Sequence, residues 1–408
     1  MEFDADIEAL IQRVAMVVTV SLAGYIKRVP LSTYRSQQRG GKGRAGMALR
    51  EEDFLSQVFV ASTHAPVLFF TSSGRVYKLK VHRLPLATPQ ARGRPMVNLL
   101  PNLAPGETIS TVMPLPEDEE RWSDLAVMFA TANGYVRRNA LGDFGNVMAN
   151  GKIAMKFEGE DADDRLIAVA TCTEANDVLL ATRNGRAIRF PVGDVRVFSG
   201  RSSVGVRGIR LLGDDLVISM SILRHVEVAP DVRNAYLGLA AKRRRETGED
   251  GEAAPEPQPD LDEADGENGG GDGAISEEVY ADLAGREECV LSVTEKGFGV
   301  RSSAYGYRIT GRGGQGINNM DLTRRRDAIV AVFPVGQNDQ IMLVTDAGMV
   351  IRCPVNDIRI VRRGGAGVVI FKVGEGERVV SVARLPEESD ENGAGEEPED
   401  ESDNQQNQ

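Results

Sequence analysis

The stretch Val67-Leu-Phe-Phe-Thr71-Ser-Ser-Gly74-Arg-Val-Tyr-Lys78 contains the pattern that determines the fold of this chain. An apolar run of strand-forming residues ends at Ser/Thr-x-x-Gly, and a second strand-like run follows the glycine. Glycine readily adopts the positive φ that a tight hairpin turn requires. The stretch therefore predicts two short antiparallel strands joined by a turn.

The pattern occurs six times in 408 residues, which indicates a repeat protein. The other turns are Ser21-Leu-Ala-Gly24, Thr131-Ala-Asn-Gly134, Thr182-Arg-Asn-Gly185, Thr294-Glu-Lys-Gly297 and Thr345-Asp-Ala-Gly348. The glycines are 50, 60, 51, 112 and 51 residues apart, and the long gap is one period plus an acidic insertion. Roughly four short strands per repeat predict an all-β fold, a propeller-like disc or shallow spiral of six four-stranded blades. One blade cannot bury its own apolar face, so neighbouring blades must stack.

Basic residues recur at two positions of the repeat. The fourth residue after each turn glycine is a base, which we call a G+4 base; these are Arg28, Lys78, Arg138, Arg189, Arg301 and Arg352. About sixteen residues after the turn glycine, three repeats carry Gly-Gly-x-Gly, and the others carry shorter glycine-containing versions. Bases in or beside these segments are Arg92, Arg94, Lys152, Arg201 and Arg312. We expect both sets to bind phosphate groups; the alternative is that the G+4 bases only solvate outer strands.

The net charge of −12 does not exclude nucleic acid as a partner, because the charge is unevenly distributed. Residues 226–286 have a net charge of −10, and residues 387–408 carry ten acids and no base, which leaves +8 for the rest. No apolar run approaches 18 residues, so we expect no membrane span. The three cysteines are far apart, which predicts neither a disulfide framework nor a metal knuckle and fits a reducing cytoplasm.

Composition also divides the chain. Residues 1–14 form a lead-in segment whose 6–14 portion has helical spacing, and 15–386 form the repeat domain. The insertion 226–286 is expected to contain helices around 231–245 and 276–284, separated by a disordered Glu/Asp/Gly/Pro-rich stretch. The acidic tail 387–408 is also expected to be disordered.

A loop in the first repeat, Gln37-Gln38-Arg39-Gly40-Gly41-Lys42-Gly43, resembles the glutamine-arginine-glycine box of DNA gyrase A proteins. Gly24-Tyr-Ile-Lys-Arg-Val-Pro, Gly74-Arg-Val-Tyr-Lys and Ala91-Arg-Gly-Arg-Pro-Met-Val are similar to the same family. The resemblance covers about 15–386 without the insertion. Two features depart from the family pattern: Gln38 stands where a second base is common, and the acidic insertion has no assigned family role.

This resemblance implies a six-bladed β-pinwheel that binds duplex DNA around its rim and bends it into a wrap of positive handedness. In the whole enzyme that wrap allows strand passage to introduce negative supercoils. The domain itself would be non-catalytic and would need no cofactor or metal. The catalytic tyrosine would lie in an upstream region of gyrase A, and ATP would bind the gyrase B protein of an A2B2 assembly in the bacterial cytoplasm, at the nucleoid. Arg39, Lys42 and Arg44 would add charge to a loop whose glycines let bare N–H groups approach phosphate.

Three alternative functions remain open. A topoisomerase IV-type domain would bend DNA without a stable wrap, a protein-interaction propeller would show no strong salt-dependent DNA affinity, and a propeller hydrolase would need His and carboxylate side chains that the repeats do not offer at fixed positions. The few aromatic residues, 5% of the chain, argue against single-strand binding, which stacks bases on rings. Gly311-Arg-Gly-Gly-Gln-Gly316 fits a dinucleotide-binding pattern, but no helix is expected after it.

Overall fold

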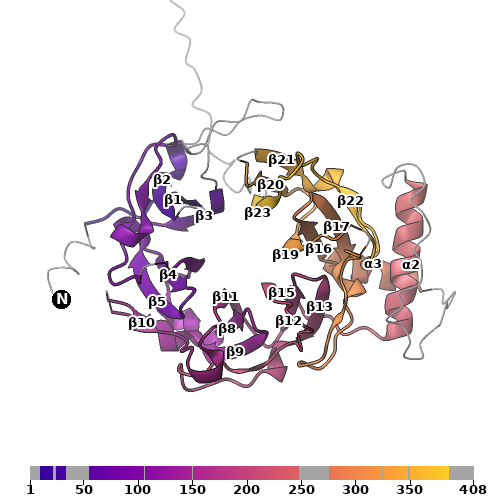
Figure 1. Cartoon of the computed structure of the whole chain (residues 1–408), viewed down its shortest axis with the longest axis horizontal. Helices are drawn as coiled ribbons and strands as arrows, with labels where there is room; N and C mark the ends of the chain where they lie inside the picture. The colour runs from indigo at the N-terminus through magenta and orange to yellow at the C-terminus, as the bar shows by residue number, and fades with distance from the viewer. Residues whose placement is uncertain are drawn as a thin grey trace, which may run out of the picture.

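The computed structural model describes residues 10–21, 24–33, 55–104, 106–148, 150–247, 275–323, 325–347 and 350–385. Within these ranges it contains six antiparallel sheets arranged around a central axis, which confirms the all-β, six-bladed prediction (Figure 1). In this view, one end strand of each sheet lies toward the axis. The sixth sheet has three described strands, and the other five have four.

Each blade extends from an inner strand near the axis to an outermost strand at the perimeter. In that order, blade 1 is β3 (Leu55–Ser62), β1 (Ala15–Ser21), β2 (Tyr25–Pro30) and β6 (Arg94–Pro95). Blade 2 is β7 (Ile109–Pro114), β4 (Pro66–Thr71), β5 (Arg75–Lys80) and β10 (Lys152–Ile153). Blade 3 is β11 (Leu166–Cys172), β8 (Ala126–Thr131), β9 (Tyr135–Ala140) and β14 (Val206–Arg207). Blade 4 is β15 (Val217–Arg224), β12 (Asn176–Thr182), β13 (Arg186–Pro191) and β18 (Ile317–Asn318). Blade 5 is β19 (Ile329–Val335), β16 (Cys289–Thr294), β17 (Phe298–Ser303) and β22 (Val368–Val369), and blade 6 is β23 (Val379–Leu385), β20 (Gln340–Thr345) and β21 (Val350–Pro354).

The outermost strand of each four-stranded blade comes from the following repeat, which the sequence did not reveal. Thus β6 belongs to the second repeat but pairs with β2 of blade 1, and β22 of the sixth repeat pairs with β17 of blade 5. A segment of seven to eleven residues must cross to the preceding blade each time. This exchange links neighbouring blades through backbone hydrogen bonds as well as through packing.

The Ser/Thr-x-x-Gly turns form as expected. Gly74 has φ of 81° and donates its N–H to the carbonyl of Thr71 at 3.0 Å, while the Thr71 hydroxyl accepts from the N–H of Arg75 at 3.0 Å. A glycine in the left-handed region after a turn is the usual way to match hairpin twist. The hydroxyl explains why Ser or Thr begins each turn. The last turn glycine, Gly348, lies outside the described residues.

The core consists of apolar layers between neighbouring blades. Along β8, Val127 and Phe129 pack against blade 2, whereas Ala126 and Met128 pack against blade 4. Successive side chains of a strand point to opposite faces, so a strand between two blades is buried on both. This is why the second strands, such as β4 and β8, read as continuous apolar runs rather than as alternating ones. Similar layers join blades 1 and 2, 4 and 5, and 5 and 6.

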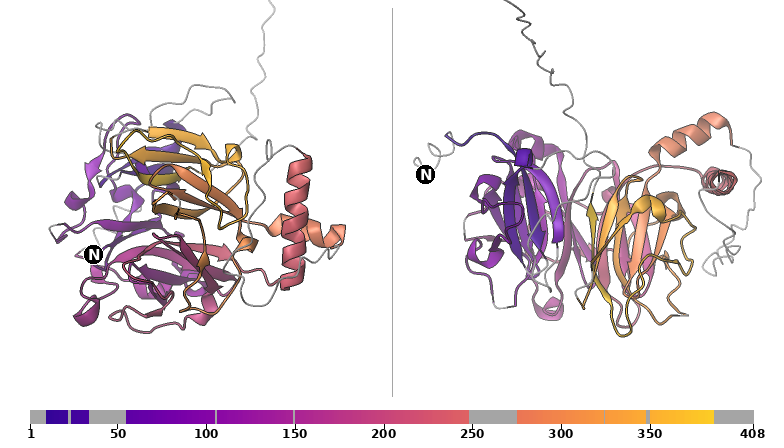
Figure 2. Two further views of the ribbon diagram at one scale, coloured as in Figure 1. Left: turned by 45° about the vertical axis from the view of Figure 1, so that its right-hand side comes forward. Right: turned by 90° about the horizontal axis from the view of Figure 1, so that it is seen from above.

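Two helices in the acidic insertion are present where the sequence predicted them. They are α2 (Pro230–Glu246) and α3 (Glu277–Arg286), and both lie outside the ring of sheets, beside blade 5 (Figures 1 and 2). Tyr236 of α2 is 1% exposed and packs edge-on against Tyr305 at 5.4 Å. The disorder expected between the helices and in the tail concerns residues outside the described ranges, as does most of the helical lead-in.

A second glycine in the repeat allows the backbones of two repeats to approach closely within one blade. Gly316 has φ of 73°, and an added Cβ would lie 2.4 Å from the carbonyl oxygen of Ala187 on β13. We expect Gly316→Ala to lower the free energy of unfolding by at least about 2 kcal/mol, because strain and a backbone clash add. Gly314→Ala in the same loop is the control, since the nearest atom to its Cβ would be in the Ile188 side chain, at 3.7 Å. Urea unfolding of both variants measures the difference, and equal stabilities would contradict this explanation.

Candidate nucleic-acid interface

The G+4 bases lie between blades rather than on the surface. Each described G+4 base from Arg28 to Arg301 donates to a carbonyl in, or directly after, a 3-10 turn of the next repeat. Arg28 Nε donates to Leu84 O at 2.8 Å, Arg189 Nη1 to Ala304 O at 2.8 Å, and Arg301 Nη1 to Val355 O at 3.1 Å. Arg138 reaches Val195 O at 3.5 Å, and Lys78 reaches Gly145 O at 2.8 Å. These bases therefore hold consecutive blades together.

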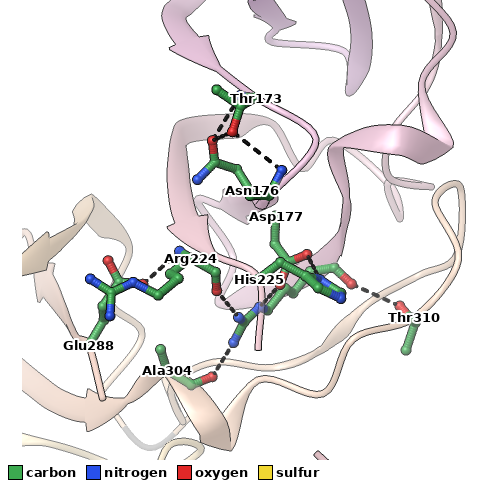
Figure 3. A network of polar contacts seen from close by, with 10 residues as sticks. Thr173, Asn176, Asp177, Arg224, His225, Glu288, Ala304 and Thr310 are labelled. Carbon is green, nitrogen blue, oxygen red and sulfur yellow. Dashed lines mark hydrogen bonds and ion pairs between the residues drawn. The ribbon is translucent and has the colours of Figure 1, made fainter. Parts of the chain in front are cut away.

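The contact between blades 4 and 5 contains a buried ion pair (Figure 3). Asp177 is fully buried, its Oδ2 lies 2.8 Å from Arg189 Nε, and its Oδ1 lies 2.7 Å from His225 Nδ1. Arg189 Nη2 also donates to the carbonyl of Arg224 at 2.9 Å. One guanidinium thus joins β12, the end of β15 and the 3-10 turn of blade 5. Buried charges are normally paired and hydrogen-bonded in this way.

This placement contradicts the expectation that Arg138, Arg189 and Arg301 contact DNA. Arg138, Arg189 and Arg301 are 7%, 3% and 6% exposed, so a phosphate cannot reach them without separating two blades. The Lys78 side chain is 15% exposed and pairs with Glu119. Arg28 is half-buried, and burial lowers its pKa. Among the described G+4 bases, Arg352 alone is exposed, and it stays a candidate DNA contact.

The second predicted set of bases lies at the outer edge of the blades. Arg94 is exposed on β6, Lys152 lies on β10, and Arg312 is exposed in the loop that leads to β18. Arg92 and Arg201 are half-buried in the corresponding loops of their own repeats. All five belong to the segment that crosses to the preceding blade. The structure thus brings them to equivalent places around the perimeter.

The crossing segment that leads to β10, 145–151, contains no arginine. We call the other four crossing segments between a 3-10 turn and an outermost strand the rim loops; they are 84–93, 195–205, 307–316 and 358–367. Together they contain eight arginines and no Asp or Glu, in a chain with 60 acids and 48 Lys and Arg. A charge excess of this kind creates a local positive potential on an otherwise acidic protein. Several exposed arginines on or beside these loops are not among the residues predicted from the sequence, although the absence of acids indicates them; they are Arg196, Arg207, Arg308 and Arg362.

Aromatic rings support three of the cations near the rim. The Arg92 guanidinium lies 3.6 Å from the centre of the Tyr25 ring, and that of Arg325 lies 3.6 Å from the Phe298 ring. Arg207 lies 4.8 Å from the Tyr135 ring and donates to its hydroxyl at 2.9 Å. The three aromatic residues each directly follow a turn glycine. Such contacts restrict a guanidinium while leaving it charged and able to donate.

The box itself lies outside the described residues. This applies to every predicted contact within it: Gln37, Gln38, Arg39, Gly40, Gly41, Lys42, Gly43 and Arg44. Within the described ranges, no group of three or more His, Cys, Asp or Glu side chains could hold a metal ion. Burial raises the pKa of the Cys172 thiol to about 11, so this cysteine is protonated at neutral pH. In the part of the chain that the structure describes, no helix has the length and apolar character to cross a membrane.

Comparison with known families gives a match along the repeats. The family model described as DNA gyrase C-terminal domain, beta-propeller, matches 15–62, 65–116, 126–173, 176–224, 290–336 and 339–386. These six segments follow the six repeats and leave out the insertion that contains α2 and α3.

Curated relatives and solved structures agree with this match. The chain is 49% identical over 391 residues to the DNA gyrase A protein of Rickettsia bellii, covering 96% of this chain and 41% of the relative. It is 51% identical over 360 residues to that of Granulibacter bethesdensis, covering 87% and 38%. The chain thus spans about two fifths of the length of these relatives. The solved C-terminal domain of DNA topoisomerase IV superposes with a TM-score of 0.64 at 20% identity, covering 92% of this chain and 94% of that one. The solved C-terminal domain of DNA gyrase A superposes with a TM-score of 0.59 at 19% identity, covering 91% of this chain and 99% of that one. Both likenesses show the fold alone.

Proposed function

Because the chain belongs to the family of DNA gyrase C-terminal β-propeller domains, we propose that it binds duplex DNA around its rim and bends it into a chiral wrap. In the complete enzyme, made with the rest of gyrase A and with gyrase B, this wrap presents a neighbouring duplex for strand passage and so introduces negative supercoils. The domain contributes binding and shape, and the cleavage and ATP chemistry belong to the other parts. The observation that carries the proposal is the set of acid-free arginine loops at the outer edge of blades 1, 3, 4 and 5.

The energetics favour many distributed phosphate contacts. Smooth bending of a duplex by 40–90° costs on the order of 1–6 kcal/mol, and a nearly complete turn costs on the order of 10–20 kcal/mol by extension. A few strong contacts cannot offset such a cost, whereas rim loops distributed around the ring can. Contacts of arginine with phosphate carry no base information, so we expect weak sequence preference and a strong dependence on salt.

A topology assay tests the proposal directly. Nicked circular DNA is mixed with the chain, ligated and deproteinised, and the topoisomers are separated on a gel. We expect a positive linking shift that grows with protein concentration and is lost in the variant Arg39→Ala/Lys42→Ala. Binding without a shift would support the topoisomerase IV-type alternative, which bends without wrapping. If no salt-dependent binding occurs, the domain is instead a protein-interaction propeller.

A further inference from the structure

Two cations are completely buried directly behind rim loops, and the DNA contacts proposed above do not use them. Lys27 of β2 and Arg137 of β9 have 0% exposure. Each immediately precedes a G+4 base: Lys27 precedes Arg28, and Arg137 precedes Arg138. Successive residues of a strand point to opposite faces, so the two members of each pair do as well. The G+4 member reaches the 3-10 turn of the next repeat or the residue directly after that turn. The other member reaches further along the rim loop that follows the same turn.

Lys27 gathers the backbone of rim loop 84–93. Its ammonium donates to the carbonyls of Thr88 at 3.2 Å and Ala91 at 3.0 Å, and also to that of Pro89. These carbonyls belong to the four residues directly before Arg92. Burial lowers the pKa of Lys27 to about 8, so at neutral pH the group keeps its proton and its three donors.

Arg137 does the same for rim loop 195–205. Its Nη1 donates to the carbonyls of Arg201 at 2.9 Å and Ser203 at 2.6 Å, and its Nη2 donates to the carbonyl of Ala154. Its Nε donates to Asn139 at 2.7 Å, and the Asn139 amide in turn donates to Phe198 O at 2.8 Å and to Gly200 O. One guanidinium and one amide thus bind four carbonyls of a single loop.

The direction of these bonds matters for binding an anion. A carbonyl oxygen is the negative end of a peptide dipole and would repel a phosphate that approached it. Here the oxygens point inward to a buried cation, so the outer side of each loop presents arginine side chains. Order also matters, because holding a flexible loop in place at the moment of binding has a cost in conformational entropy. A loop fixed in advance avoids it.

We propose that Lys27 and Arg137 are positioning residues for DNA binding: each holds a rim loop so that the arginines on it and on the adjoining outer strand, Arg92 with Arg94 and Arg201 with Arg207, face phosphate. This inference rests on the proposed function. Neither buried cation touches DNA. Their role is to fix the shape and polarity of the surface that does.

The variant Lys27→Met tests this role, and Arg28→Met is its matched control. Both remove a cation that donates to backbone carbonyls across the same pair of blades. Arg28 reaches only the first residue of the rim loop, Leu84, whereas Lys27 holds the residues directly before Arg92. Duplex affinity is measured against salt concentration for both. We expect Lys27→Met to weaken binding about tenfold and to reduce the salt slope by about 1–2 units, because loss of each phosphate contact removes about 0.9. Arg28→Met should leave the slope unchanged, and Lys27→Arg should restore most of the affinity.

A double-variant cycle separates positioning from a general loss of stability. In an Arg92→Ala/Arg94→Ala background, Lys27→Met should change affinity less than about twofold, because the contacts it positions are already absent. Full additivity, or wild-type affinity and slope in a folded Lys27→Met protein, would overturn the proposal. If Lys27→Met does not fold, Lys27→Gln takes its place in the same cycle, and Arg137→Gln is tested in an Arg201→Ala/Arg207→Ala background.

Amide hydrogen exchange gives a readout that does not depend on DNA. Exchange in 86–94 should accelerate in Lys27→Met and stay unchanged in Arg28→Met, and equal acceleration in both would contradict the role of Lys27 in ordering the loop. If the wild-type chain does not bind duplex DNA at all, the proposed function fails, whatever the exchange shows. The two failures are therefore distinguishable.

Discussion

Simultaneous replacement of Arg94, Lys152, Arg207 and Arg312 by alanine should nearly abolish duplex binding at physiological salt. These side chains lie on, or in the loop leading to, the outermost strands of blades 1 to 4. We expect affinity to fall on the order of 10²–10³-fold and the salt slope to decrease by about 3.6, from about 0.9 for each lost phosphate contact. Fluorescence anisotropy of a labelled duplex over a series of salt concentrations measures both quantities. Thermal unfolding should be little changed, because surface substitutions of this kind typically alter stability by about 0.5 kcal/mol or less each.

A control with the same change in charge shows whether position matters. Lys156, Arg183, Arg286 and Arg378 each form an ion pair with a nearby carboxylate and lie outside the rim loops and outermost strands. Their replacement by alanine also removes four positive charges. We expect affinity to fall less than about tenfold, because these side chains act on DNA only through the long-range potential of the protein. If this variant loses as much affinity as the rim variant, net charge rather than the rim would explain binding.

The sequence was sufficient to predict the number of blades and the hairpin turns, because one local signal determines each. Ser or Thr three residues before a glycine fixes a turn, and six copies at a steady period fix six sheets. The exchange of the outermost strand was not predictable in the same way. Strands such as Val206–Arg207 are two residues long, and their partners lie in another repeat about 70 residues away. No local sequence pattern predicts that pairing.

The same exchange explains why the G+4 bases were misinterpreted. A base that recurs at a fixed place in a repeat can contact a repeated ligand or a repeated neighbour, and the sequence does not distinguish these. Arg189 stands in Ala187-Ile-Arg-Phe190, where the residues on both sides of it are buried. Strands buried on both faces leave no solvent side for the base. An arginine within a continuous apolar run therefore predicts a contact between blades. An arginine in a glycine-rich loop without acids predicts an exposed side chain.

Loss of the Asp177 carboxylate should be among the most damaging single changes in the chain. Asp177→Ala removes the partner of Arg189, which is 3% exposed, and one contact of His225. An unpaired charge then remains buried between blades 4 and 5, and breaking a buried pair in this way typically lowers stability by about 3–5 kcal/mol. We expect a loss of this size in urea unfolding. We also expect a broader transition, because repeat arrays lose cooperativity when one contact between neighbours is weakened.

An ion pair of the preceding G+4 base is a natural control. Arg138 is nearly as buried as Arg189, and its Nη2 lies 2.5 Å from Glu174, but the Glu174 side chain is 71% exposed. Water can replace that carboxylate, so Glu174→Ala should cost about 1 kcal/mol or less. The two variants remove the same kind of group from the same kind of guanidinium, and the main difference is burial. Equal losses would mean that pairing itself determines the strength of these contacts. A large loss confined to Asp177→Ala would mean that the joint between blades 4 and 5, where the insertion with α2 and α3 leaves the ring, depends on one desolvated ion pair.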